Sequence, residues 1–198
     1  MRQSAVNTEL FKSTLIAGVL PDCDSTRPRK ILDFGEAHAS TIAHLQRTFW
    51  GRLTVLDLIS QASEINALLS DDEASEQRAA VLEDSFEPCI GQAYDLVLMW
   101  DFALYLSDSN LNWLNDWLDA MLTYDGVAHG FVCHNATRGL VAKRWGIVGL
   151  DQLEAESGSA ELPYRHLRGA LSRGLPDFQI DKSVLMKDGR LEFVIRRG

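Results

Sequence analysis

The stretch KILDFGEAHASTIAHL, which runs from Lys30 to Leu45, joins the signal of a buried strand to the signal of a helix. A continuous apolar run over Lys30–Phe34 predicts a short buried strand. Asp33-Phe34-Gly35 ends this run, and a chain that turns sharply from strand to helix at a glycine commonly holds a ligand. The helix signal consists of a capping hydroxyl followed by apolar residues at helical spacing: Ser40 or Thr41, then Ile42, Leu45 and Phe49.

The composition around this stretch is that of a globular protein. The chain has 198 residues, 46% of them hydrophobic and 24% charged, which favours one domain with one continuous core. A formal net charge of −9 argues against a nucleic-acid partner, because binding to phosphates needs clustered Lys and Arg. Three scattered cysteines predict neither a disulfide framework nor a metal site. The N-terminus lacks the apolar core of a signal peptide and no run reaches the length of a membrane span, so we expect a cytoplasmic protein without a membrane partner.

Strand-like and helix-like patterns alternate along the chain. This alternation predicts parallel strands with helices on both faces of a sheet. An Asp188-Gly189 pair between two late strand patterns predicts an antiparallel hairpin. We therefore expect an α/β fold, a Rossmann-like, doubly wound, mostly parallel seven-stranded sheet closed by a C-terminal antiparallel hairpin. Further strands are expected at Leu53–Leu58, Arg78–Leu82, Tyr94–Trp100 and Val127–Cys133, the hairpin at Phe178–Met186 and Leu191–Arg196, and helices at 8–20, at 61–69, from Ser107 or Asp108 to Thr123 and at Tyr164–Leu171.

Two segments lie outside this alternating pattern. Residues 1–27 are expected to form a helical N-terminal extension or lid on a single domain that spans 28–198. Residues 134–163 are interpreted as irregular with short helical pieces. These two segments remain to cover a pocket, and Arg138, Lys143, Arg144 and Trp145 form a small basic-aromatic cluster in the second one.

Polar residues recur where the predicted strands end. In a doubly wound sheet the ligand site lies outside the carboxyl ends of the strands. Asp57 lies about twenty residues beyond the glycine turn, where a carboxylate can accept hydrogen bonds from both hydroxyls of a ribose. Asp84 can accept a hydrogen bond from an exocyclic amine and Ser85 can donate its backbone N–H to a ring nitrogen, while Ile59 and Phe86 can form apolar walls. These residue types predict a nucleoside lying across the strand ends.

This constellation resembles the class I S-adenosylmethionine-dependent methyltransferases. The row Asp33-Phe34-Gly35-Glu36-Ala37-His38-Ala39 matches the acid and the first glycine of the family's first motif, while its next two glycines are alanines here. Asp57 matches the acid that ends the second strand, Asp84 the polar residue that ends the third, and YDLVLMW a common form of the fourth strand. The resemblance covers about residue 28 to the end. It implies S-adenosylmethionine as the cofactor, with these candidate binding residues: Asp33, Gly35, Glu36, Ala37, Asp57, Leu58, Asp84, Ser85 and Trp100.

The methyl acceptor and the catalytic group are less well defined by the sequence. A small molecule or a protein is favoured over nucleic acid by the net acidity. A general base is needed only for acceptors of high pKa, and Asp101, Tyr105 and His134 are weak candidates for that role.

Two other hypotheses stay open. The eroded glycine row is compatible with a catalytically degenerate protein that uses the methyltransferase fold for ligand or protein binding. Trp113 and Trp117, one helical turn apart, then become a possible homodimer or partner surface, although packing under a neighbouring helix is the favoured interpretation. A nicotinamide-dependent oxidoreductase ranks third, because its G-x-G-x-x-G turn is missing.

Overall fold

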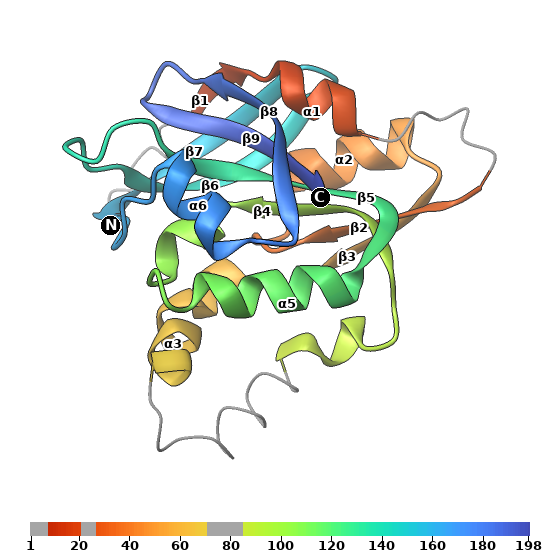
Figure 1. The fold of residues 1–198 in the computed structure, drawn as a ribbon. Coiled ribbons are helices and arrows are strands. Elements are labelled where there is room, and N and C mark those ends of the chain that lie inside the picture. Colours follow the sequence, from red (N-terminus) through yellow and green to blue (C-terminus); the bar gives the residue numbers. More distant parts are fainter. Residues whose placement is uncertain (1–7, 21–26, 71–84) are drawn as a thin grey trace.

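The computed structural model describes residues 8–20, 27–70 and 85–198. Within these ranges a six-stranded sheet forms the centre of the molecule, in the spatial order β3-β2-β4-β5-β9-β8 (Figure 1). The three strands β3, β2 and β4 are parallel to one another and to β5, while β9 runs antiparallel to both of its neighbours, β5 and β8. The bounds of the strands are β2 (Arg29–Asp33), β3 (Gly51–Val55), β4 (Tyr94–Trp100), β5 (Leu122–Cys133), β8 (Phe178–Leu185) and β9 (Arg190–Arg197).

The central position of β4 follows from its sequence. All seven residues of YDLVLMW are buried, as expected for a parallel strand that is covered on both faces. The strand predicted over Arg78–Leu82 lies outside the described residues, so the seven-strand count stays a prediction. The described chain therefore supports a mixed α/β fold around a mostly parallel sheet.

Helices cover both faces of the sheet. On one face, α5 (Leu111–Met121) packs with α3 (Leu58–Ser70) and α6 (Arg168–Gly174); on the other lie α1 (Thr14–Val19) and α2 (Ala39–Thr48) (Figure 1). Each face has its own hydrophobic cluster, which is the layered arrangement of a doubly wound sheet. Two short 3-10 helices, η1 (Glu87–Cys89) and η2 (Phe102–Tyr105), flank β4.

A second, three-stranded sheet was not expected from the sequence. It consists of β1 (Thr8–Lys12), β7 (Gln152–Glu161) and β6 (Val141–Gly149), in that spatial order, and we call it the small sheet. The expected helix over 8–20 is therefore wrong for Thr8–Lys12, and helix begins only at Thr14. The irregular assignment of 134–163 is wrong as well, because most of it forms β6 and β7.

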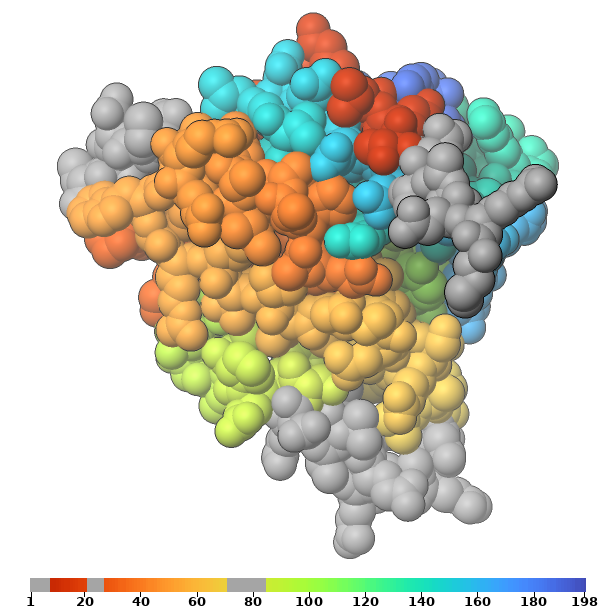
Figure 2. All heavy atoms as spheres, turned by 180° about the vertical axis from the view of Figure 1, so that it is seen from behind, coloured from red at the N-terminus to blue at the C-terminus, as the bar shows by residue number. Residues whose placement is uncertain are grey.

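The small sheet packs against α2, the helix that follows β2. Thr41 Oγ1 on α2 accepts a hydrogen bond of 2.9 Å from the backbone N–H of Ile147 on β6. His38, the residue before α2, lies 3.2 Å from Glu154 on β7 through Nδ1 and Oε1. In the space-filling view, the orange segment that contains α2 lies directly beside the cyan strands of the small sheet (Figure 2). These contacts hold the small sheet against the start of α2, beside the carboxyl end of β2.

Several element boundaries differ from those expected, and two of the shifts affect the site. Strand β3 ends at Val55 and helix α3 begins at Leu58, which places Asp57 in the turn between them. Helix α2 begins at Ala39 behind His38, so Ser40 and Thr41 lie inside its first turn and do not cap it. Helix α5 follows Asn110 and ends at Met121, before Gly126. Within the described residues, no helix has the length and apolar character needed to cross a bilayer.

Candidate functional site

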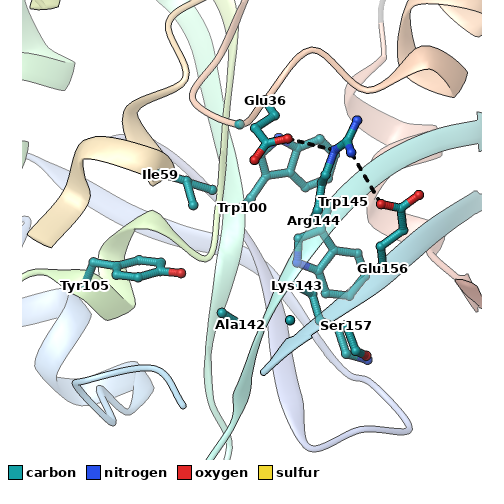
Figure 3. A pocket seen from close by; sticks show the side chains of 12 residues that line it. Glu36, Ile59, Trp100, Tyr105, Ala142, Lys143, Arg144, Trp145, Glu156 and Ser157 are labelled. Atoms are coloured by element: carbon teal, nitrogen blue, oxygen red, sulfur yellow. Dashed lines mark hydrogen bonds and ion pairs between the residues drawn. The ribbon is translucent and has the colours of Figure 1, made fainter. Parts of the chain in front are cut away.

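A pocket of about 370 Å³ lies where the carboxyl ends of β2 and β4 meet the small sheet. One side is formed by the turn after β2 and by the first turn of α3. The other side is formed by β6 and β7, so the pocket exists only because the small sheet folds over the strand ends (Figure 3). Its lining residues include Gly35, Glu36, Ile59, Trp100, Tyr105 and Trp145.

Asp33 and Trp100 together form the floor of the turn after β2. Asp33 Oδ1 accepts hydrogen bonds from the backbone N–H of Gly35 at 2.8 Å and from Trp100 Nε1 at 2.6 Å. Both side chains are buried. Burial raises the pKa of Asp33 from 3.8 to about 7, against the two hydrogen bonds that lower it. The acid of the glycine row is therefore used by the protein itself to fix the turn and the indole of Trp100.

Gly35 is required for space at this turn. A Cβ at this position would lie 2.9 Å from Cδ1 of Trp100 and 3.2 Å from Oδ1 of Asp33. Among the described residues other than glycine, only Asp57 and Trp100 have positive φ angles, so Ala37 and Ala39 replace glycines without backbone strain. The eroded glycine row is thus compatible with an intact turn.

Asp57 has a different environment at the end of β3. Its φ of 49° lies in the left-handed region, which Asp tolerates better than most residues. Its backbone oxygen accepts a hydrogen bond of 2.9 Å from Ser60 Oγ. Its side-chain Oδ1 is buried and has no hydrogen-bond partner among the described residues. A buried carboxylate oxygen without a partner is unfavourable, so Asp57 Oδ1 is an acceptor that the described residues leave unused.

The remaining predicted cofactor residues are distributed around this edge. Glu36 lines the pocket and is half-exposed, while Ala37 is exposed beside it. Leu58 is fully buried in the core at the start of α3. Ser85 donates a hydrogen bond of 3.1 Å from its Oγ to Gln61 on α3, and Asp84 lies outside the described residues.

The three candidate catalytic residues differ in burial, in hydrogen bonding and in whether they line the pocket. Asp101 is fully buried and accepts hydrogen bonds from Arg190 through both carboxylate oxygens, at 2.8 and 2.9 Å. Trp145 Nε1 also donates to Asp101 Oδ2 at 3.2 Å. His134 is exposed after β5 and does not line the pocket. Only Tyr105 lines the pocket with a side chain that is not already engaged, and its pKa is raised by burial and by Asp101.

The basic-aromatic cluster is largely neutralised in the fold. Arg144 lies 3.0 Å from Glu36 and 3.4 Å from Glu156 at the mouth of the pocket, which Figure 3 shows as two dashed lines. Lys143 Nζ lies 3.2 Å from Glu9 and 3.0 Å from Asp188. Two of the three cations of the cluster, Lys143 and Arg144, are therefore paired with carboxylates.

Trp113 and Trp117 pack inward. The Trp117 ring lies 4.2 Å from that of Phe86 and 5.2 Å from that of Phe34, and Trp113 lies 5.7 Å from Phe86, all between ring centroids. Both tryptophans are partly buried against the core cluster. The face formed by these tryptophans thus packs within the described chain, and a homodimer through it has no support.

Sequence reasoning missed the part of the pocket that β7 supplies. Glu156, Ser157 and Gly158 line the pocket, together with Ala142 on β6. One signal was available on the neighbouring strand β6. Lys143, Trp145 and Ile147 alternate there and are all buried, but the charge of Lys143 hides the apolar alternation that indicates a strand.

Comparison with known proteins identifies the fold. No family model and no curated protein matches the chain. The solved structure of Burkholderia thailandensis 1,6-didemethyltoxoflavin-N1-methyltransferase, with bound 1,6-didemethyltoxoflavin and S-adenosylhomocysteine, is similar to it with a TM-score of 0.50 and 17% identity, over 93% of this chain and 77% of that one. An S-adenosylmethionine-dependent methyltransferase from Clostridium acetobutylicum gives a TM-score of 0.49 and 10% identity, over 85% and 84% of the two chains. The first of these similarities establishes that the chain has the fold of an S-adenosylmethionine-dependent methyltransferase.

Proposed function

We propose that this protein binds S-adenosylmethionine and transfers its methyl group to a small-molecule acceptor. The observation that carries the proposal is Oδ1 of Asp57 after β3, which is buried and has no hydrogen-bond partner among the described residues. A carboxylate at that strand end is suited to a ribose, and the similar methyltransferase of known structure was solved with S-adenosylhomocysteine. The fold and this one oxygen therefore support the same cofactor.

The residues around the pocket suit the rest of the cofactor. Its amino-acid end carries one carboxylate and one ammonium, and these two charges can exchange partners with the ion pairs that Arg144 makes with Glu36 and Glu156 at the pocket mouth. Gly35 allows close approach at the turn. Asp84 and Ser85 stay predictions for the adenine, beside Ile59 and Phe86.

The chemistry places few demands on the protein. When bound, the cofactor supplies a methyl group on a positively charged sulfur, which is already electrophilic. The chain's own residues have to orient the acceptor and exclude water. Asp101 is bonded to Arg190 and Trp145, so we assign it a positioning role and leave Tyr105 as the group that faces the acceptor.

Calorimetric titration tests this proposal. We expect S-adenosylmethionine and S-adenosylhomocysteine to bind the purified protein, with NAD as the negative control. Asp57→Asn, which keeps the side-chain shape and tolerates the positive φ, should weaken binding by about tenfold or more, because hydrogen bonds to a charged carboxylate are among the stronger ones. Asp125→Asn, at an exposed position near the start of β5, is the matched control and should bind as the wild type does. Absence of binding of either ligand to the wild type would refute the proposal.

A further inference from the structure

We propose that the methyl acceptor is an uncharged, planar aromatic small molecule that sits between Tyr105 and the indole rings of Trp100 and Trp145. This inference rests on the proposed methyltransferase function and adds the substrate class. We call this part of the pocket the aromatic slot. Figure 3 shows Tyr105 on one side of it, Trp100 and Trp145 on the other, and Ala142 between them.

The two indole rings form a rigid aromatic wall. Their planes differ by 8° and their centroids lie 6.5 Å apart, which is an offset-stacked arrangement. Each ring is fixed by a buried hydrogen bond, from Trp100 Nε1 to Asp33 and from Trp145 Nε1 to Asp101. Phe131 packs behind Trp145 at 4.4 Å between ring centroids. Only 1% of Trp100 and 3% of Trp145 is exposed, so a flat ligand would contact the small part of this rigid wall that lines the pocket, without any loss of side-chain freedom.

The size of the slot favours a small, flat molecule. The neighbouring wall carries only short side chains, at Ala142, Ser157 and Gly158. The whole pocket has about 370 Å³, which is near the lower end of small-molecule sites and has to hold part of the cofactor as well. One or two fused rings fit this space better than a bulky or folded acceptor.

The charges around the slot disfavour an anion. Arg144 is paired with both Glu36 and Glu156, so this group of three has an excess of one negative charge. Lys143 is paired with Glu9 and Asp188. A phosphate or carboxylate on the acceptor would therefore meet a negative mouth, where the two cations that line the pocket, Lys143 and Arg144, are already paired with carboxylates.

Tyr105 supplies the polar contact that a heteroaromatic or phenolic acceptor needs. Its hydroxyl points into the pocket in Figure 3 and makes no hydrogen bond to any described residue. A tyrosine phenol is protonated at neutral pH, and burial and Asp101 raise its pKa further, so the hydroxyl can donate to an oxygen or nitrogen of the acceptor. We assign Tyr105 as the residue that positions the acceptor.

Binding of three matched probes tests the inference without any enzyme assay. The probes are 2-naphthol, its saturated counterpart 2-decalol, and 2-naphthyl phosphate, each titrated with and without S-adenosylhomocysteine. The readout is the set of tryptophan indole N–H signals in ¹⁵N-labelled full-length protein. We expect 2-naphthol to shift the signals of Trp100 and Trp145 by its ring current and to leave the other three tryptophans unchanged. We expect 2-decalol and 2-naphthyl phosphate to bind at least tenfold more weakly.

Two variants locate the probe. Ala142→Leu should fill the slot and abolish the naphthol shifts while S-adenosylhomocysteine still binds, whereas Ala136→Leu at an exposed turn should change neither. Tyr105→Phe should weaken 2-naphthol about three- to tenfold, and Tyr124→Phe, on an exposed tyrosine, should not.

The possible outcomes separate this inference from the proposed function. If S-adenosylhomocysteine binds but 2-naphthol leaves Trp100 and Trp145 unshifted, or binds no better than 2-decalol, the aromatic acceptor is refuted and the methyltransferase proposal stands. If S-adenosylhomocysteine fails to bind and 2-naphthol still shifts both indoles, the slot is supported as an aromatic site and the methyltransferase proposal fails.

Discussion

Asp33 and Asp57 follow two neighbouring parallel strands, yet they occupy opposite chemical situations. Asp33 is buried and its Oδ1 accepts two hydrogen bonds from the protein, one from the turn after β2 and one from Trp100. Asp57 has a buried Oδ1 to which no described residue donates. The same residue type at equivalent strand ends thus stabilises the fold in one case, and in the other we propose that it binds a ligand. The experiments below test this difference, from the largest expected effect to the smallest.

The carboxylate at the end of β4 extends the comparison to a third strand. Arg190→Met removes the only cation bonded to Asp101 among the described residues and leaves that carboxylate buried without a compensating charge. We expect a loss of about 3–5 kcal/mol in the free energy of unfolding, measured by urea denaturation. Arg196→Met on the same strand removes an exposed pair with Asp181 and should lose at most about 1 kcal/mol. Equal losses in the two variants would show that Asp101 is not held in this way.

Asp33 should make the stability of the protein depend on pH. Its folded pKa of about 7 lies above its ordinary value of 3.8, so the folded state binds the extra proton between these values. The stability that this proton contributes is complete below about pH 4 and is lost as the pH rises toward 7, up to about 4 kcal/mol in total. Asp33→Asn keeps an acceptor oxygen and cannot titrate.

Urea denaturation of the wild type and of Asp33→Asn at several pH values measures this contribution. We expect the wild type to lose stability relative to the variant as the pH rises through this range. A constant difference between the two proteins would mean that Asp33 titrates normally.

Gly35 tests the packing at the satisfied turn. An alanine Cβ would lie 2.9 Å from an indole that Asp33 holds in place, so Gly35→Ala should lose roughly 1–3 kcal/mol of unfolding free energy. Gly18→Ala, on an exposed helical position with open space around it, should be neutral or slightly stabilising. Thermal denaturation of the two variants gives the comparison, and a neutral Gly35→Ala would show that Trp100 moves freely.

Asp57→Asn should have the smallest effect on the protein without ligand. Because Oδ1 has no hydrogen-bond partner to lose among the described residues and Asn tolerates a positive φ, the free energy of unfolding should change by less than about 0.5 kcal/mol. Urea denaturation of the ligand-free variant checks this. A large loss would mean that Asp57 has a structural partner after all.

Local sequence signals predicted the strands of the main sheet that the structure describes. YDLVLMW is apolar enough to identify β4 unaided, and Asp188-Gly189 lies at the tight connection between β8 and β9. Asp57 was predicted as a cofactor residue because a strand-end acid about twenty residues after a glycine turn has a recognisable spacing, and this role stays a prediction. These features depend on residues that are close together in the sequence.

The strands of the small sheet could not be predicted from local sequence signals, for physical reasons. Lys143 lies on the buried face of β6, where Glu9 and Asp188 compensate its charge, and this lysine interrupts the apolar alternation that marks a strand. In β1 only Phe11 is buried, and the strand exists through its pairing with β7, more than a hundred residues away. Because these strands were not predicted, the part of the pocket lining that comes from β6 and β7 was not predicted either.

A cycle that varies both ligand and protein tests the central claim most directly. Calorimetry would compare S-adenosylhomocysteine with its 2′-deoxy and 3′-deoxy analogues on the wild type and on Asp57→Asn. If Asp57 accepts the ribose hydroxyls, each deoxygenation should weaken binding to the wild type by about tenfold and have little further effect on the variant. Equal losses in both proteins would contradict the account, because the hydroxyls would then be bound by another part of the molecule.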